Sequence, residues 1–247
     1  MKTAVKYILH RLLGFHNYLF LFSLYKIYSL KWDKKENDFF FFLKHIPVNT
    51  TVLDIGANIG IMTTHLARSI KGVHVFAFEP MPSNIKALNR IINHFNLKNV
   101  TVLNYALGNT EGELEMIMPV INSVKMQGLS HVMHDSITEF NEGEKFKCPV
   151  HKLDNLSGLW SGRQVSGIKI DVENFEYFVL DGGKEFLKVH RPLVYAELWE
   201  NENRNKCFEL MKSLGYNIYV QHENKIETFN PGIHKKQNFI LSTSLLP

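Results

Sequence analysis

The sequence predicts an α/β fold in which a doubly wound, mostly parallel sheet is covered by helices on both faces. From residue 50 onward, short runs of β-branched and aromatic residues alternate with helical patterns, which is typical of such a sheet. The chain has 247 residues, of which 45% are hydrophobic, so it can bury one sizeable core. Two late strand patterns, residues 216–221 and 237–242, flank a polar loop and predict one antiparallel strand near the C-terminus.

The predicted elements follow from these patterns in chain order. The first strand, residues 51–55, precedes a glycine turn and a helix. Residues 108–150 break the rhythm with glycines and polar clusters, which predicts a long excursion rather than a second domain. The other elements are strands at 73–78, 100–107, 113–118, 146–151, 167–171 and 193–197, a helix capped by Ser83, a helix from about Glu173 to Gly182, and a helix that ends before Gly215.

The chain divides into an N-terminal segment, residues 1–49, and a main domain, residues 50–247. Residues 1–32 hold five lysines and arginines and no acid, which leaves 23 basic against 24 acidic residues in the rest of the chain. The basic character is therefore local, and we expect no nucleic-acid partner. The two cysteines, Cys148 and Cys207, cannot form a disulfide framework or a Cys-rich zinc site, and a cytoplasmic location is expected.

The N-terminal segment is rich in aromatic and basic residues and is expected to be helical. Its longest uncharged stretch, Leu12 to Tyr25, has 14 residues, whereas a membrane-spanning helix needs about 20. Two interpretations stay open. The segment packs on the main domain or on a second copy of the chain, or it lies on an anionic membrane surface, where interleaved basic and aromatic residues are favoured.

The most informative motif is Val52-Leu-Asp-Ile-Gly-Ala-Asn-Ile-Gly60. Glycines directly after a buried strand let the backbone approach a nucleotide-like ligand and open a helix toward it. A dinucleotide fingerprint would read G-x-G-x-x-G, whereas this turn reads G-x-N-x-G and follows an acid that would repel a pyrophosphate. That acid can accept hydrogen bonds from an ammonium, which favours S-adenosylmethionine. The predicted cofactor residues in this motif are Asp54, Gly56, Ala57, Asn58 and Gly60.

Two further positions complete the predicted cofactor site. Glu79 ends the second strand 19 residues after Gly60, close to the spacing at which an acid reaches ribose hydroxyls in doubly wound folds. At the end of the third strand, Asn104 can donate an amide hydrogen bond to an adenine, which can lie against the small side chain of Ala106.

The chain resembles the FkbM-type family of S-adenosylmethionine-dependent methyltransferases. This resemblance implies a class I methyltransferase fold of the Rossmann-like type and transfer of a methyl group, usually to a hydroxyl of a sugar or natural product. One departure is Asn174, where the family commonly has glycine; asparagine tolerates a left-handed backbone better than most residues. The motifs that carry the resemblance lie at residues 52–60, 77–82, 104–108, 168–176, 179–182 and 194–198.

Asp171 and Glu173 are the predicted acceptor-side acids. They fall at the carboxyl end of a central strand, the edge where open α/β sheets bind ligands. A base that removes the acceptor's hydroxyl proton is needed there. The alternative is a carboxylate that only contacts the cofactor or Lys169.

His134, with His131 and Asp135 beside it, is a further candidate base in the excursion. Surface histidines, an acceptor-pocket base and a metal site all stay open for this cluster, and we assign no metal. Glu197, which ends the next strand, either lines the pocket or makes a structural hydrogen bond.

Together these features predict an O-methyltransferase that acts on a hydroxyl-bearing acceptor, specifically a saccharide in a glycan or glycolipid precursor. The alternatives are a methyltransferase of small molecules or secondary metabolites, and a catalytically silent module that retains the cofactor pocket. Retention of Asp171 and Glu173 argues against the silent module.

Overall fold

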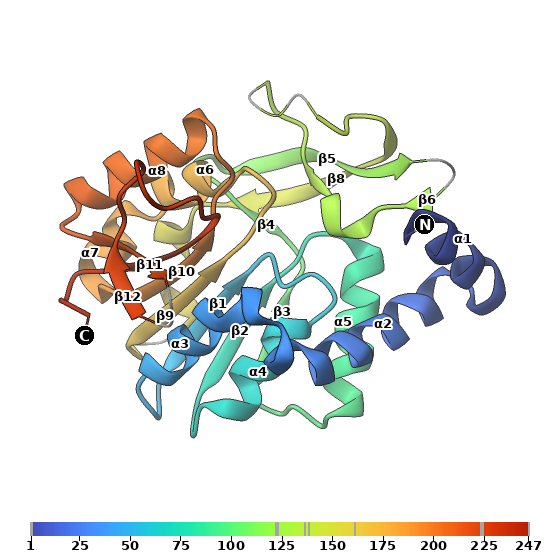
Figure 1. Ribbon diagram of the computed structural model, residues 1–247, viewed down its shortest axis with the longest axis horizontal. Helices are drawn as coiled ribbons and strands as arrows, with labels where there is room; N and C mark the ends of the chain where they lie inside the picture. Colours follow the sequence, from blue (N-terminus) through green and yellow to red (C-terminus); the bar gives the residue numbers. More distant parts are fainter. Residues whose placement is uncertain are drawn as a thin grey trace.

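The computed structural model describes residues 2–121, 124–135, 137, 139–160, 162–222 and 225–246. Its main sheet has eight strands in the order β12-β11-β13-β10-β9-β1-β2-β3, and it confirms the predicted doubly wound α/β fold (Figure 1). The parallel strands are β1 (Thr51–Ile55), β2 (His74–Phe78), β3 (Val100–Leu103), β9 (Val165–Ile170) and β10 (Leu193–Glu197).

The C-terminal edge of the sheet contains the predicted antiparallel strand. β13 (Asn238–Ser242) runs antiparallel between β10 and β11 (Asn217–His222). A further antiparallel strand, β12 (Lys225–Thr228), pairs with β11 at the edge, in a stretch where the sequence indicated only a polar loop. The sheet therefore has two antiparallel strands within the described residues.

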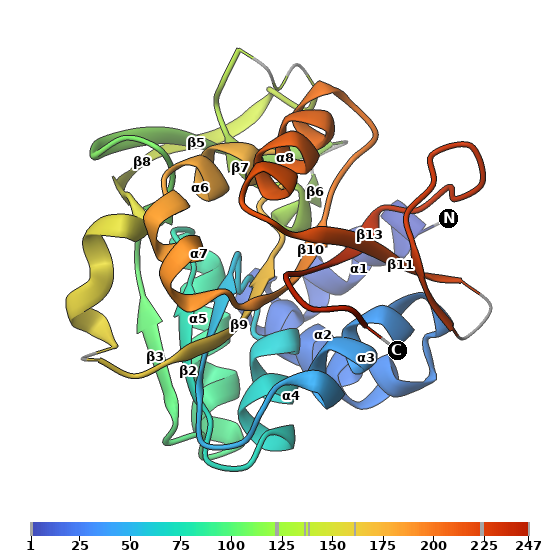
Figure 2. The same ribbon diagram turned by 90° about the vertical axis from the view of Figure 1, so that its left-hand side faces the viewer.

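Helices cover both faces of the sheet because apolar side chains alternate between the faces along each strand. Val52 and Val75 pack on the side of α3 (Asn37–His45) and α4 (Ile61–Ser69), whereas Leu53 and Phe76 belong to the core on the opposite side. Figure 2 shows α2 to α4 on one side of the sheet and α6 to α8 on the other. The latter are α6 (Glu176–Asp181), α7 (Lys184–His190) and α8 (Glu202–Ser213).

The excursion forms a second, smaller sheet in the order β4-β8-β5-β6, with β7 paired to β5. Its two long strands, β5 (Gly112–Ile121) and β8 (Gly143–His151), extend beyond the ranges that the sequence predicted. The predicted strand at 100–107 is interrupted because β4 (Ala106–Leu107) leaves the main sheet to pair with β8. The remaining elements here are β6 (Val124–Lys125), η3 (Gln127–Leu129), β7 (His131–Val132) and η4 (Leu153–Leu159).

Two helix starts differ from the prediction. The helix α5 (Pro82–His94) begins with proline in its first turn, and Ser83 does not cap it; its N-cap residue is Met81. The helix expected from about Glu173 begins at Glu176, because Glu173 and Asn174 both have a positive φ, 54° and 73°. The left-handed backbone expected at Asn174 is therefore present.

The N-terminal segment forms α1 (Lys2–Leu13), α2 (Phe15–Ser29), η1 (Leu30–Trp32) and η2 (Lys34–Glu36) before α3. One face of α2 is buried against the main domain through Tyr18, Leu19, Ser23 and Ile27, and the helix lies beside α5 and α4 (Figure 1). No helix in the described part of the chain has both the length and the apolar character needed to cross a membrane. The opposite side exposes Leu21, Tyr25, Tyr28 and Trp32.

The packing of α2 leads to a stability prediction. Leu19 is 0% exposed, so Leu19→Ala should lower the free energy of unfolding by about 2–5 kcal/mol through lost contacts and a cavity. Leu21 on the same helix is 47% exposed and serves as the matched control. Leu21→Ala should change the free energy of unfolding by less than about 0.5 kcal/mol. Urea unfolding followed by circular dichroism measures both. Equal effects of the two substitutions would mean that α2 does not pack as described.

Candidate functional site

The glycine turn after β1 is fixed by backbone hydrogen bonds and by close packing. The N–H groups of Gly56 and Ala57 each donate to the carbonyl of Phe78 at 3.0 Å. Gly56 has a φ of 78°, and a Cβ there would lie 1.8 Å from the carbonyl oxygen of Asp171. Only glycine therefore lets β1 and the end of β9 approach this closely. Gly60, with a φ of 85°, precedes α4 and packs against Leu88.

Glu79 is buried beneath the turn rather than solvated at the strand end. Its Oε2 accepts the N–H of Asn58 at 2.7 Å, and its Oε1 accepts the N–H of Met81 at 2.9 Å and the amide of Asn84 at 3.3 Å. A carboxylate offers about four lone-pair sites, so room remains for one ribose hydroxyl and not for two. Burial raises the pKa of Glu79, and these hydrogen bonds lower it. Burial has the larger effect, and the pKa of Glu79 is about 7.

Removing this carboxylate should weaken cofactor binding. In Glu79→Ala the N–H groups of Asn58 and Met81 lose their acceptor, and a ribose hydroxyl loses a charged partner worth about 1.5–3 kcal/mol. We expect the affinity for S-adenosylhomocysteine to fall roughly 10- to 100-fold in isothermal titration calorimetry. Glu113→Ala on exposed β5 is the control and should leave the affinity unchanged. An unaltered dissociation constant for Glu79→Ala would remove Glu79 from the site.

A first cavity, the cofactor cavity, opens beside this turn at the carboxyl ends of β1, β2 and β9. Of the predicted site residues, the structure brings together Gly56, Asn58, Glu79, Ala106, Asp171 and Glu173 around it. Asn104 is exposed and does not line it, because the chain turns away between β3 and β4. The sequence analysis missed several of its wall residues, namely Met81, Tyr105, Gln127, Gly128 and Phe175.

The lining of the cofactor cavity has the chemistry that the nucleoside part of S-adenosylmethionine needs. The buried Oδ1 atoms of Asn58 and Asn84, both in its wall, have no hydrogen-bond partner among the described residues, as expected for groups that meet a polar ligand. Apolar walls from Phe78, Tyr105 and Leu107 suit a flat base. The carboxylate of Glu79, in the same wall, can accept one further hydrogen bond, as a ribose hydroxyl would require.

Asp54 lies below the turn and lines neither this cavity nor its neighbours. Its side chain is 0% exposed, its Oδ2 accepts the hydroxyl of Thr63 at 2.6 Å, and its Oδ1 lies 3.4 Å from the ammonium of Lys169. The ammonium that the sequence assigned to Asp54 thus comes from the protein itself. Asp54 fixes the turn from inside and does not face the cavity.

Four carboxyl groups gather at the carboxyl ends of β9 and β10. Burial, together with Asp171, raises the pKa of Glu173 to about 9 and that of Glu197 to about 7. Burial also raises the pKa of Glu176 to about 8, although its Oε1 accepts the N–H of Val172 at 2.9 Å. We call Asp171, Glu173 and Glu197 the acid group, and Glu176 closes the loop that carries two of its members.

The loop between β9 and α6 is also held by asparagines. The Oδ1 of Asn174 accepts the amide of Asn201 at 2.7 Å, and the amide of Asn203 donates to the carbonyl of Asn174 at 3.0 Å. Asn201 caps α8 by accepting the N–H of Arg204. A glycine at position 174 would lack the side-chain contact with Asn201, so the side chain of Asn174 ties the acid-bearing loop to the start of α8.

The side chains of His131, His134 and Asp135 do not line the cofactor cavity. His134 is exposed in a surface hollow that shares no lining residue with the cofactor cavity, and its ring packs against Phe178. His131 is buried, and its ring nitrogens lie 2.8 Å from the carbonyl of Leu129 and 3.0 Å from Oδ1 of Asn141. The structure therefore favours structural or surface roles for these histidines.

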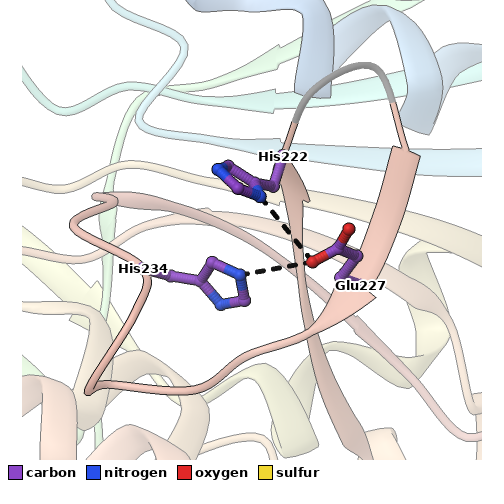
Figure 3. A group of neighbouring side chains, drawn as sticks. All are labelled: His222, Glu227 and His234. Carbon is purple, nitrogen blue, oxygen red and sulfur yellow. Dashed lines mark ion pairs between the residues drawn. The ribbon is translucent and has the colours of Figure 1, made fainter.

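Two further histidines and a glutamate lie close together at the outer strands β11 and β12 (Figure 3). They are His222, His234 and Glu227. Oε2 of Glu227 is 3.7 Å from Nδ1 of His222 and 3.4 Å from Nε2 of His234. The N–H of Asn230 donates to Nδ1 of His234 at 3.0 Å, so the proton of the neutral ring is on Nε2, the atom that faces Glu227. Because a metal would need the lone pair of that nitrogen, we assign no metal to this group.

Glu176 gives a pH-dependent stability prediction. Its pKa is about 8 in the folded protein and about 4.3 in an unfolded chain, so the unfolded state loses this proton first and stability falls between about pH 4.3 and 8. Glu176→Gln keeps the acceptor for Val172 and removes the titration. We expect a shallower fall in melting temperature from pH 5 to 8. The control is Glu185→Gln, at an exposed site; an identical fall in wild type and Glu176→Gln would contradict the prediction.

The fold and the cofactor cavity are those of a class I, S-adenosylmethionine-dependent methyltransferase. A model of the Methyltransferase FkbM domain matches residues 54–234, most of the chain. The chain therefore belongs to the FkbM methyltransferase family, as its motifs indicated, and S-adenosylmethionine is its cofactor.

Individual relatives are distant. Two curated proteins are each 24% identical: the AMB antimetabolite synthetase AmbE of Pseudomonas aeruginosa, over 56% of this chain and 8% of its own length, and Methyltransferase 1 of Beauveria bassiana, over 55% and 59%. The chain thus spans less than two thirds of either. The crystal structure of Methyltransferase FkbM from Methylobacillus flagellatus is 15% identical with a TM-score of 0.51, covering 79% of this chain and 44% of that one, and this likeness supports the fold.

Proposed function

We propose that the protein is an O-methyltransferase that transfers a methyl group to a hydroxyl of a saccharide, in a glycan or glycolipid precursor. The observation that carries this proposal is the acid group at the carboxyl ends of β9 and β10, of which Asp171 and Glu173 line the cofactor cavity. A hydroxyl is a weak nucleophile until a base takes its proton, and carboxylates are the bases that this edge of the sheet offers.

The acid group suits proton removal near neutral pH. When bound, S-adenosylmethionine would supply an electrophilic methyl group. Asp171 and Glu173 border the cavity. Asp171 can accept the hydroxyl proton, whereas Glu173 can accept it only after losing its own proton, because burial and Asp171 raise its pKa to about 9. Glu197 lies close enough to Asp171 for their charges to interact. A carboxyl group whose pKa is raised to about 7, as in Glu197, is a stronger base than an ordinary glutamate once it is ionised.

Further properties of the enzyme belong to the same proposal. Several carboxyl groups around a cavity suit a polyhydroxyl acceptor, because each carboxylate can accept hydrogen bonds from hydroxyl groups. The outer side of α2 and η1, with exposed Leu21, Tyr25, Tyr28 and Trp32 beside Lys31, suits contact with an anionic membrane surface or with a second copy of the chain. Membrane contact would bring a cytoplasmic enzyme to lipid-linked acceptors.

A test of the proposal combines an acceptor screen with substitutions in the acid group. Candidate saccharides and small-molecule alcohols are incubated with radiolabelled methyl donor, and label transfer is measured. Asp171→Asn or Glu173→Gln should lower turnover about 100- to 10,000-fold at saturating cofactor, because a general base is lost. Cofactor affinity is measured separately by calorimetry, so that a loss of turnover can be distinguished from a loss of cofactor binding.

The control is Glu115→Gln, on the exposed part of β5, which should keep full turnover. Full turnover in both acid variants would leave Glu197 or His134 as the base, or none. Label transfer to small alcohols alone would favour the alternative of a small-molecule methyltransferase. No transfer to any acceptor, with cofactor binding intact, would favour a silent binding module.

A further inference from the structure

A second cavity, of about 190 Å³, lies on the other side of the glycine turn. It shares Gly56, Asn58, Gln127, Gly128 and Asp171 with the cofactor cavity, so the two flank the same backbone. Glu79, which faces the ribose side, does not line it. A ligand whose ribose contacts Glu79 would therefore reach the second cavity with its far end.

The N-terminal segment forms one wall of this second cavity. Phe22, Lys26, Leu30 and Glu36 line it, although they precede the region matched by the family model. The helix that carries Lys26 is tied to the core on both sides of this residue. The hydroxyl of Ser23 lies 3.1 Å from the carbonyl of Ile59 in the turn, and Nε2 of His65 lies 3.1 Å from the carbonyl of Ile27. Lys26 is thus held at a fixed place opposite the turn.

Two lysines line the second cavity, and they differ in what they already contact. Lys169 is buried, donates to the carbonyl of Gly56 at 2.7 Å, and lies 3.4 Å from Asp54 and 3.8 Å from Asp171. Within the described part of the chain, Lys26 has one ion pair, at 3.5 Å with Asp33, and the Asp33 side chain is 36% exposed. Lys26 is therefore the cation of this cavity that can turn to a ligand.

We propose that Lys26 binds the carboxylate at the methionyl end of S-adenosylmethionine. That end carries a carboxylate and an ammonium on one carbon, and the second cavity offers both complements: the ammonium of Lys26, and the carboxylates of Glu36 and Asp171. Asp54, which the sequence analysis assigned to the ammonium, is buried beneath the turn. The inference depends on the cofactor and not on the acceptor proposed above.

The test compares two ligands that differ only in the carboxylate. S-adenosylhomocysteine and its decarboxylated analogue are titrated by calorimetry into wild type, Lys26→Met and Lys31→Met. Lys31, exposed on η1 over the ring of Trp32, controls for the loss of one positive charge from the same segment. Melting temperatures show whether each variant is folded.

We expect Lys26→Met to lower the affinity for S-adenosylhomocysteine roughly 10- to 50-fold and to leave that for the decarboxylated analogue nearly unchanged. Lys31→Met should affect neither ligand. Equal losses for both ligands in Lys26→Met, or no loss for S-adenosylhomocysteine, would overturn the inference alone. A wild-type protein that binds neither ligand would overturn it together with the cofactor assignment.

Discussion

The buried ammonium of Lys169 holds together the three segments that form the site. It stands opposite Asp54 in the pairing of β9 with β1, donates to the carbonyl of Gly56, and lies near Asp171 at the end of its own strand. Burial alone would lower the pKa of Lys169, but Asp54 and Asp171 raise it, and the net shift is upward. Without this charge Asp54 would be a buried carboxylate with no ion-pair partner, and such a group destabilises a folded protein by several kcal/mol. The glycine turn, the cofactor cavity and the acid group all depend on this contact.

The charge balance around Lys169 also shapes what the site accepts. One ammonium stands among Asp54, Asp171, Glu173 and Glu197, so carboxyl groups outnumber it. Burial in the first place, and this excess in the second, raise the pKa values of Glu173 and Glu197, so that without a further cation both groups hold protons more strongly than an exposed glutamate. A positively charged ligand relieves the repulsion, whereas a neutral one does not.

Much of the sheet could be predicted from the sequence because its strands are short β-branched or aromatic runs with clear ends. The predicted ranges for β1 and β10, residues 51–55 and 193–197, match the structure. The prediction of one continuous strand at 100–107 was wrong because β4 pairs with β8 instead of the main sheet. The local sequence does not show this pairing, since β8 lies more than 40 residues away. The helix start at Glu176 was missed for a similar reason: the loop is held by Asn201 and Asn203, from another helix.

Site residues could be predicted from the sequence where they lie at the end of a strand beside the cavity. They could not be predicted where their position depends on residues far away in the sequence. Gly56, Asn58, Glu79 and Asp171 border the cofactor cavity as the motifs indicated. Asp54 did not, because whether a strand-end carboxylate faces a ligand or a buried lysine depends on Lys169, which is 115 positions later. Gln127 and Gly128 carry no motif and reach the site only through the second sheet.

The N-terminal segment shows how a site can extend beyond the domain that defines the family. The family match begins at residue 54, so the matched region contains the turn, Glu79 and the acid group. The opposite wall of the second cavity comes from α2, η1 and η2, where no motif guided the prediction. Because α2 is anchored by a hydroxyl to the carbonyl of Ile59, and α1 reaches Gln127 through the ammonium of Lys6 at 3.1 Å, the segment joins both sides of the turn. The aromatic and basic residues of the segment therefore lie on two surfaces. The inner surface packs against the site, and the outer surface is exposed and could contact a membrane or a partner.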